Sequence, residues 1–225
     1  ALFAVYAILA AHIGKKNTGE GQFIDASLFD AALAFSIWDT SQYWGTGVEP
    51  YKLGTANHMS APYQAMKAAD GYFVMGATNQ KLWALLCEKI NRPELMNDAR
   101  FMTNPLRLAN REVLVTELEK TFVTKTGAEW VDLLLAEGIP AGPINTYPEA
   151  FESEHGKHRQ MRMEIDHPIE GKVPNIGFAV KLSGTPQQVR MHPPLLGEHT
   201  NSVLAEIGIT GEALKAFEAG GAFLP

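Results

Sequence analysis

The chain has 225 residues, of which 46% are hydrophobic and 20% charged, and its formal net charge at pH 7 is −6. These values fit a soluble globular protein of one or two domains, and the acidic balance gives no reason to expect nucleic acid as a partner. The longest apolar run, residues 1–13, is too short to span a bilayer, so no membrane partner is expected. The single cysteine, Cys87, cannot form an internal disulfide, which agrees with a cytoplasmic location or, in a eukaryote, the mitochondrial matrix.

Residues 1–45 predict the order helix, strand, helix. Apolar residues occur on every side of residues 1–13, which indicates a helix buried against a sheet. A polar turn is expected over 15–21, a short strand over 23–27, and a long helix with an apolar face over 28–44. This order is typical of an α/β layer. The apolar helical pattern opens at Ala1 without a cap, so we expect the chain to be part of a longer protein.

Residues 46–61 contain Gly, Pro and Asn and show little periodicity, which favours a linker between domains. A small α+β domain is expected over 62–145. Its predicted elements are a strand over 72–76 and helices over 81–90, 110–123 and 128–136.

A second linker is expected over 146–165, with a short polar helix over 147–158. Alternating residues between 163 and 182 predict strands, interrupted at Gly171-Lys172 and at Pro174. The C-terminal segment, 166–225, is expected to end in helix.

The string Pro193-Pro194-Leu195-Leu196-Gly197-Glu198-His199-Thr200 predicts a turn followed by a helix. The two prolines exclude a helix before the string, Gly197 permits a sharp turn, and Thr200 or Asn201 can cap the helix that follows. A glutamate in the first turn also favours a helix through its dipole. Glu198 and His199 are therefore expected either to brace the last helix or to support a functional site.

Three strings in this order resemble the family III CoA-transferases, whose best-known type is formyl-CoA:oxalate CoA-transferase. They are Asn17–Leu28, which reads NTGEGQFIDASL, then Ala61–Tyr72, with APYQAM and DGY at its two ends, and Pro193–Thr200. The resemblance covers nearly all of the chain. Family members are roughly twice this long and carry a nucleophilic aspartate that would lie a few residues before Ala1. The chain therefore resembles the C-terminal part of such an enzyme, without the N-terminal half.

The resemblance implies a fold and a reaction. Residues 1–45 and 166–225 would be parts of a Rossmann-like large domain, and two chains would interlock in a homodimer. The enzyme would transfer coenzyme A between an acyl-CoA and a free carboxylic acid, through an aspartyl anhydride and an aspartyl-CoA thioester. CoA would be a substrate, and neither a permanent cofactor nor a metal is expected. This chain alone, without the nucleophile, is expected to be inactive.

The small polar segment Gly54–Ser60 is the best candidate for a substrate loop, and its candidate site residues are Asn57, His58, Met59 and Ser60. In the resembled transferases the matching loop closes over the acyl-enzyme. The formyl-CoA type has a run of glycines there that this chain lacks, which suggests a different and bulkier acid. A plain linker without a ligand would have the same composition.

Two other functions stay open. One is a racemase of 2-methylacyl-CoA esters on the same fold, for which a glutamate would be expected near the position of Asn79; an amide cannot act as a base, so the transferase is favoured. The other is a non-catalytic scaffold that needs a separate N-terminal partner. His155 and His158 are too few for a metal site.

Overall fold

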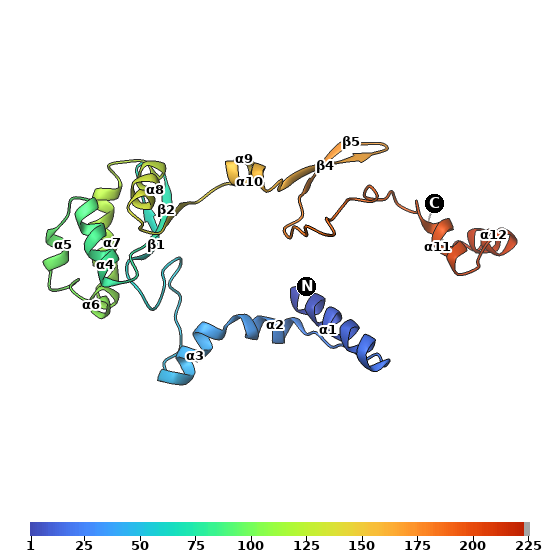
Figure 1. Ribbon diagram of the computed structural model, residues 1–225, viewed down its shortest axis with the longest axis horizontal. Helices are drawn as coiled ribbons and strands as arrows, with labels where there is room; N and C mark the ends of the chain where they lie inside the picture. The colour runs from blue at the N-terminus through green and yellow to red at the C-terminus, as the bar shows by residue number, and fades with distance from the viewer. Residues whose placement is uncertain (223–225) are drawn as a thin grey trace. The chain divides into compact units, whose positions relative to one another are not determined.

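The computed structural model describes residues 1–222 and contains both helices and strands (Figure 1). The contacts divide the chain into two units, which meet between Gly142 and Pro143. We describe each unit by itself. None of the helices in residues 1–222 is both long and apolar enough to cross a membrane.

The first unit begins with three helices, α1 (Leu2–Thr18), α2 (Leu28–Phe35) and α3 (Ile37–Thr46). α1 ends at Gly19, whose φ of 81° is left-handed and therefore suits glycine. The predicted helix over the first residues is confirmed, but it continues four residues into the segment expected to be a turn. No residue of α1, α2 or α3 is buried.

Two predictions in this region are wrong. Residues 23–27 form no strand, because among the described residues no neighbouring strand supplies backbone hydrogen bonds. Ser27 instead ends this segment by capping α2, where its Oγ accepts the N–H groups of Phe29 and Asp30. The long helix expected after it is interrupted at Ser36, whose hydroxyl donates to the carbonyl of Leu33 at 2.7 Å.

A three-stranded sheet follows, formed by β1 (Tyr63–Lys67), β2 (Tyr72–Gly76) and β3 (Ala141–Pro143) in the order β1-β2-β3. β1 and β2 are antiparallel, with Tyr63 opposite Gly76 and Lys67 opposite Tyr72. The predicted strand over 72–76 is confirmed. Its two neighbours, β1 and β3, were not predicted.

Five helices lie between β2 and β3. They are α4 (Gln80–Lys89), α5 (Glu94–Asn97), α6 (Asn104–Ala109), α7 (Arg111–Phe122) and α8 (Gly127–Ala136). The predicted helices over 81–90, 110–123 and 128–136 agree with α4, α7 and α8 to within one residue at each end. α5 and α6 are too short to show a helical period in the sequence.

The core of the first unit lies in this α+β part. Among the described residues, every buried hydrophobic side chain except Ile165 lies between Ala61 and Ile139. At its centre the ring of Phe122 packs edge-on against the rings of Phe73 and Trp130, with both centroid distances at 5.2 Å. Residues 61–141 therefore have a hydrophobic core of their own.

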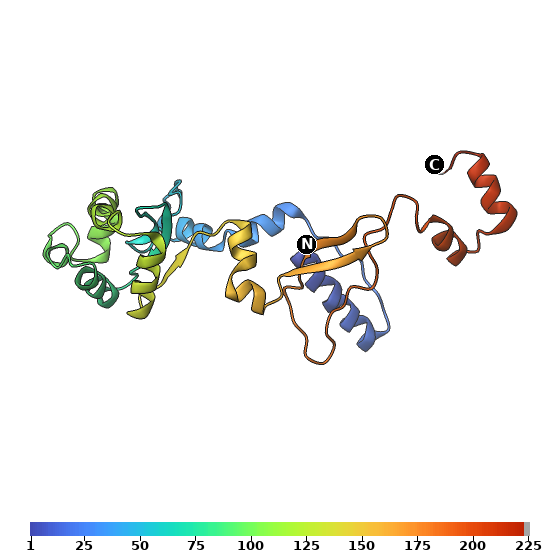
Figure 2. The ribbon, with the colours of Figure 1, turned by 90° about the horizontal axis from the view of Figure 1, so that it is seen from above.

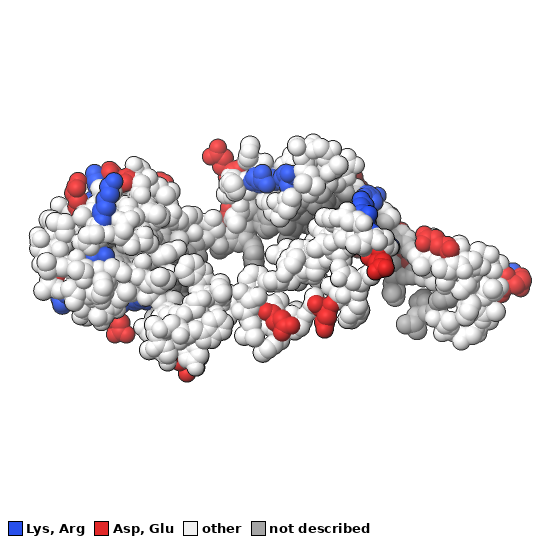
Figure 3. Space-filling view, turned by 60° about the horizontal axis from the view of Figure 1, so that its bottom comes forward, with Lys and Arg blue, Asp and Glu red and all other residues white. Residues whose placement is uncertain are grey.

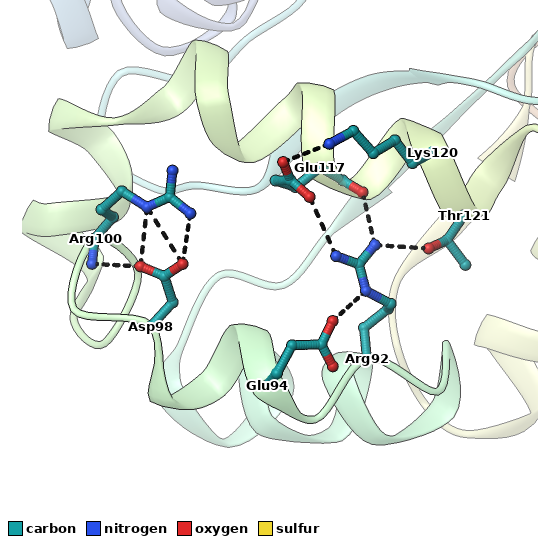
Figure 4. A network of polar contacts seen from close by, with 7 residues as sticks. All are labelled: Arg92, Glu94, Asp98, Arg100, Glu117, Lys120 and Thr121. Atoms are coloured by element: carbon teal, nitrogen blue, oxygen red, sulfur yellow. Dashed lines mark hydrogen bonds and ion pairs between the residues drawn. The ribbon is translucent and has the colours of Figure 1, made fainter.

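A polar network on the surface of this part joins the residues after α4 to α7 (Figure 4). The Arg92 guanidinium donates to the carbonyl and the carboxylate of Glu117, at 3.1 and 3.2 Å, and to the Thr121 hydroxyl at 3.1 Å. It also pairs with Glu94, while Lys120 binds the other carboxylate oxygen of Glu117 at 2.7 Å. The Arg92 side chain thus connects α5, through Glu94, to α7, through Glu117 and Thr121.

The second unit contains two short helices, α9 (Tyr147–Glu152) and α10 (Glu154–His158), then a hairpin of β4 (Arg162–His167) and β5 (Gly171–Ile176), which is orange in Figure 2. The expected interruption at Gly171-Lys172 is wrong, because β5 begins there. Pro174 lies inside β5 opposite Glu164, which a two-stranded sheet permits since each strand has a free edge.

Two further helices, α11 (Thr200–Glu206) and α12 (Gly211–Ala219), end the described part of this unit, and neither has a buried residue. Large apolar side chains are also exposed on α1, α2 and α3, among them Leu9, Phe29 and Trp38. Figure 3 shows wide areas of surface without charged side chains. These helices therefore have apolar faces that the described residues leave uncovered.

Candidate functional site

The predicted substrate loop connects α3 to β1 (Figure 1). The Asn57 side chain folds this loop on itself. The Asn57 side-chain oxygen accepts the N–H groups of Met59 and Ser60 at 2.8 and 3.2 Å, which forms an Asx turn. The Asn57 N–H donates to the carbonyl of Tyr63 at 3.0 Å. The side chain of Met59 is 59% exposed. The Asn57 side chain thus forms hydrogen bonds with the backbone of the loop, whereas the Met59 side chain is exposed.

Two side chains, one at the start of α6 and one at the start of α7, form hydrogen bonds with the backbone of the loop. The Asn104 amide, at the start of α6, donates to the Met59 carbonyl at 2.7 Å and accepts the Ala61 N–H at 3.1 Å. The Arg111 guanidinium, at the start of α7, donates to the Asn57 carbonyl. These contacts link positions more than 40 residues apart in the sequence, and they fix the loop to the α+β part of the unit.

Arg107 supports the same loop from inside the core. Its side chain is fully buried and donates to the carbonyls of Ala61 and Phe101, at 2.6 and 3.0 Å, and to the side-chain oxygen of Gln80 at 3.1 Å. The guanidinium lies over the ring of Trp83, 5.0 Å from the ring centre. Burial lowers the pKa of Arg107, because removal from water disfavours the charged form.

His58 makes the contact that reaches α3. Its Nε2 lies 2.7 Å from the Oδ1 of Asp39, and the exposed fractions of the two side chains are 29% and 46%. The loop is therefore held from two sides, by α6 and α7 through its backbone and by α3 through a side chain. Sequence reasoning selected His58 but missed Asp39, Asn104, Arg107 and Arg111, since no local pattern announces contacts of such long sequence separation.

Glu198 braces the turn before α11 and does not lie in the helix. Its carboxylate accepts the Leu195 N–H at 2.8 Å and lies 2.8 Å from Nε2 of His192. The backbone hydrogen bond and the contact with His192 lower the pKa of Glu198. The expected caps were wrong, because α11 begins at Thr200 and its N-cap position is His199, which makes no capping hydrogen bond through its side chain.

Asn79, near which a racemase would be expected to have a glutamate, caps a helix with its side chain. Its side-chain oxygen accepts the N–H of Leu82 at 2.9 Å, at the start of α4. In residues 1–222 no three side chains of His, Cys, Asp or Glu are grouped so that they could hold a metal ion.

The amino-acid sequence matches the family described as CoA-transferase family III over residues 1–200. A succinyl-CoA:glutarate CoA-transferase of Mus musculus is 38% identical over 206 residues, which are 92% of this chain and 47% of that protein. A succinyl-CoA:mesaconate CoA-transferase of Haloarcula marismortui is 32% identical over 203 residues, 90% of this chain and 50% of that protein.

The crystal structure of a CAIB/BAIF family protein from Brucella suis superposes with a TM-score of 0.75 at 33% identity, covering 92% of this chain and 53% of that chain. The chain spans about half the length of these relatives. The match over residues 1–200, which includes the loop and the brace at Glu198, shows that the chain belongs to CoA-transferase family III.

Proposed function

We propose that the full-length protein transfers coenzyme A between an acyl-CoA thioester and a free carboxylic acid. The observation that carries this proposal is the family match over residues 1–200, together with the names of relatives that are CoA-transferases. The use of Asn79 as a helix cap favours a transferase over a racemase, because an amide that caps a helix offers no base. CoA is a substrate in this reaction, and no permanent cofactor is needed.

The proposed nucleophile is an aspartate before Ala1. Its carboxylate oxygen attacks the thioester carbonyl, the C–S bond breaks, and CoA leaves as the thiolate, which gives a mixed anhydride. The thiolate then attacks the aspartyl carbonyl and releases the first acid, so that an aspartyl-CoA thioester remains. The acceptor carboxylate attacks this thioester, the C–S bond breaks, and a second mixed anhydride forms as the thiolate leaves. The thiolate finally attacks the acceptor's acyl carbon, and the aspartate carboxylate is released as the leaving group.

Water has to be excluded during these steps, because a mixed anhydride would hydrolyse. We assign this task to the loop residues Asn57, His58, Met59 and Ser60. The support is local: the loop is folded by an Asx turn, held by Asn104 and Arg111, and carries one exposed apolar side chain. Glu198 and His199 would support the site by bracing the loop before α11.

Dicarboxylic acids are the proposed class of acid substrate. Glutarate and mesaconate, in the names of two relatives, are both dicarboxylates. The absence of a glycine run in Gly54–Ser60 agrees with an acid larger than oxalate or formate.

For the assembly, we propose that residues 1–45 and 166–225 belong to a Rossmann-like large domain and that 62–145 form the small domain, joined by linkers at 46–61 and 146–165. The uncovered apolar faces of α1–α3 support this division, since the remainder of a large domain would cover them. An interlocked homodimer in the cytoplasm, or in the mitochondrial matrix of a eukaryote, completes the proposal.

The test compares the full-length protein with residues 1–225 alone, using succinyl-CoA as donor and glutarate as acceptor. We expect the full-length protein to form glutaryl-CoA and residues 1–225 to form none, because the nucleophile lies outside them. Chromatographic detection of the CoA esters measures both. Acyl exchange by residues 1–225 alone would overturn the position of the nucleophile, and no exchange by the full-length protein with any dicarboxylate would overturn the function.

A further inference from the structure

His58 is the side chain of the loop that can recognise a charged group. Of the nine residues Gly54–Pro62, His58 alone is ionisable. Arg111 donates to the Asn57 carbonyl and Arg107 to the carbonyls of Ala61 and Phe101. Nη1 of Arg111 and Nη2 of Arg107, which have no partner within residues 1–222, are buried. The His58 side chain is 29% exposed, so a second carboxylate on a substrate held at this loop would find its accessible hydrogen-bond donor at His58.

The structure shows His58 already bound to a carboxylate. Its Nε2 and the Asp39 Oδ1 are 2.7 Å apart, a close contact between an imidazole nitrogen and a carboxylate oxygen. An imidazole whose Nε2 carries hydrogen can donate to a carboxylate whether it is neutral or protonated. An aspartate side chain ends in the same group as a dicarboxylic acid, so Asp39 marks a position beside His58 that a ligand carboxylate could occupy.

A ligand carboxylate can replace Asp39 beside His58 at little cost in stability. Both side chains are partly exposed, at 29% and 46%, and exposed pairs of this kind contribute little to stability. The backbone of the loop does not depend on the contact, because Asn104 and Arg111 hold it from α6 and α7. His58 can therefore release Asp39 without unfolding the loop.

We propose that His58 binds the non-reacting carboxylate of a dicarboxylic acid substrate, and that Asp39 occupies this binding position when no substrate is present. The inference rests on the proposed function for the nature of the substrate. It makes His58 the residue that distinguishes dicarboxylic from monocarboxylic acids, and Asp39 a competitor within the chain.

The test is a direct binding measurement on the full-length protein. The imidazole NMR signals of His58, assigned by their loss in His58→Ala, are followed during titration with glutarate or with pentanoate, which has the same chain length and one carboxylate. We expect glutarate to shift the His58 signals saturably and pentanoate to leave them unchanged. Asp39→Asn should lower the Kd for glutarate, because the competing charge is removed. Equal responses to both acids, or a higher Kd in Asp39→Asn, would overturn the proposal.

Kinetics give a second readout. We expect His58→Ala to lower the ratio of kcat/KM for glutarate to kcat/KM for pentanoate about 10- to 100-fold, the equivalent of one charged hydrogen bond. The matched control is His155→Ala, because His155 is an exposed histidine on α10, and this variant should leave the ratio unchanged. A similar loss with both acids would mean that His58 is only structural. A wild-type protein without transferase activity that still shifts His58 on glutarate binding would overturn the proposed function and leave this inference standing.

Discussion

Cys87 is a buried thiol with no route to reaction. It lies on α4, is 1% exposed, and its pKa is raised to about 12, chiefly because burial disfavours the charged thiolate. We predict that the native chain does not react with a thiol reagent such as DTNB at pH 8, and that one thiol reacts after denaturation in guanidinium chloride. Stoichiometric labelling of the native protein within minutes would show that the thiol is accessible.

Asp98 gives the fold a defined dependence on acid. Hydrogen bonds from the side chain and backbone of Arg100 lower its pKa from 3.8 to about 2 (Figure 4). A carboxylate with a lowered pKa in the folded state adds stability above its unfolded pKa, and this stability is lost as the pH falls toward 2. We predict that Asp98→Asn lowers the urea midpoint of wild type at pH 6, and that the difference disappears between about pH 4 and pH 2.

Asp132→Asn provides the control for this pH series. Asp132 is exposed on α8 and has no ion pair or hydrogen bond through its carboxylate within residues 1–222. Its urea midpoint should follow that of wild type at every pH. A difference between wild type and Asp98→Asn that stays constant from pH 6 to pH 2 would contradict the assignment to the Asp98 carboxylate.

At the scale of single residues, the sequence was informative where a motif is continuous. It singled out Asn57–Ser60 and Glu198, which lie in unbroken strings. It could not supply Asp39, Arg107 or Arg111, because their contacts depend on how α3, α6 and α7 pack. The role of Glu198 was also only half predicted, since its carboxylate contacts His192 and the Leu195 N–H, which both precede α11.

Helices proved easier to predict than strands. α4, α7 and α8 each carry buried side chains at helical spacing, so their extents could be read within one residue. Residues 23–27 have the composition of a strand but no neighbour to pair with among the described residues. Pairing is a property of two segments, and so the sequence of one segment does not decide it.

The capping box of α8 is expected to stabilise the core, because α8 contributes buried side chains to it. The Thr126 side chain accepts the Glu129 N–H, and the Glu129 carboxylate accepts the Thr126 N–H at 2.8 Å. We predict that Thr126→Ala lowers the free energy of unfolding of residues 61–142 by about 1 kcal/mol, measured by urea denaturation with tryptophan fluorescence.

The same capping box occurs on α9, which makes Thr146→Ala a matched control. α9 has six residues and buries none of them, whereas α8 buries Trp130, Val131 and Leu134. Thr146→Ala in the whole chain should therefore leave the tryptophan transition unchanged. Equal losses in the two variants would mean that the caps act independently of the core.

For the molecule as a whole, the core is concentrated in one part of the chain. Among the described residues, all buried hydrophobic side chains except Ile165 lie between Ala61 and Ile139, while α1, α2 and α3 bury none. We predict that residues 61–142, produced alone, are monomeric and unfold in one cooperative transition. Residues 1–225 should instead associate as their concentration rises, because apolar faces stay uncovered.

Size-exclusion chromatography with light scattering, over a tenfold range of concentration, measures this difference. A monomeric chain of 225 residues at all concentrations would show that the exposed helices do not promote association. Loss of the cooperative transition in residues 61–142 would show that their core depends on the remainder of the protein.

The sheet β1-β2-β3 brings together two positions that are far apart in the sequence. Tyr63, where β1 begins, pairs with Gly76, and the Gly76 N–H donates at 2.9 Å to the carbonyl of Pro140, just before β3. Neighbouring strands lie about 4.8 Å apart, so the entering and leaving chains are separated by about 10 Å. Some three extended residues could bridge that gap. Residues 61–142 therefore have the geometry of an insertion, because a linker of about three residues could join the positions at which the chain enters and leaves them.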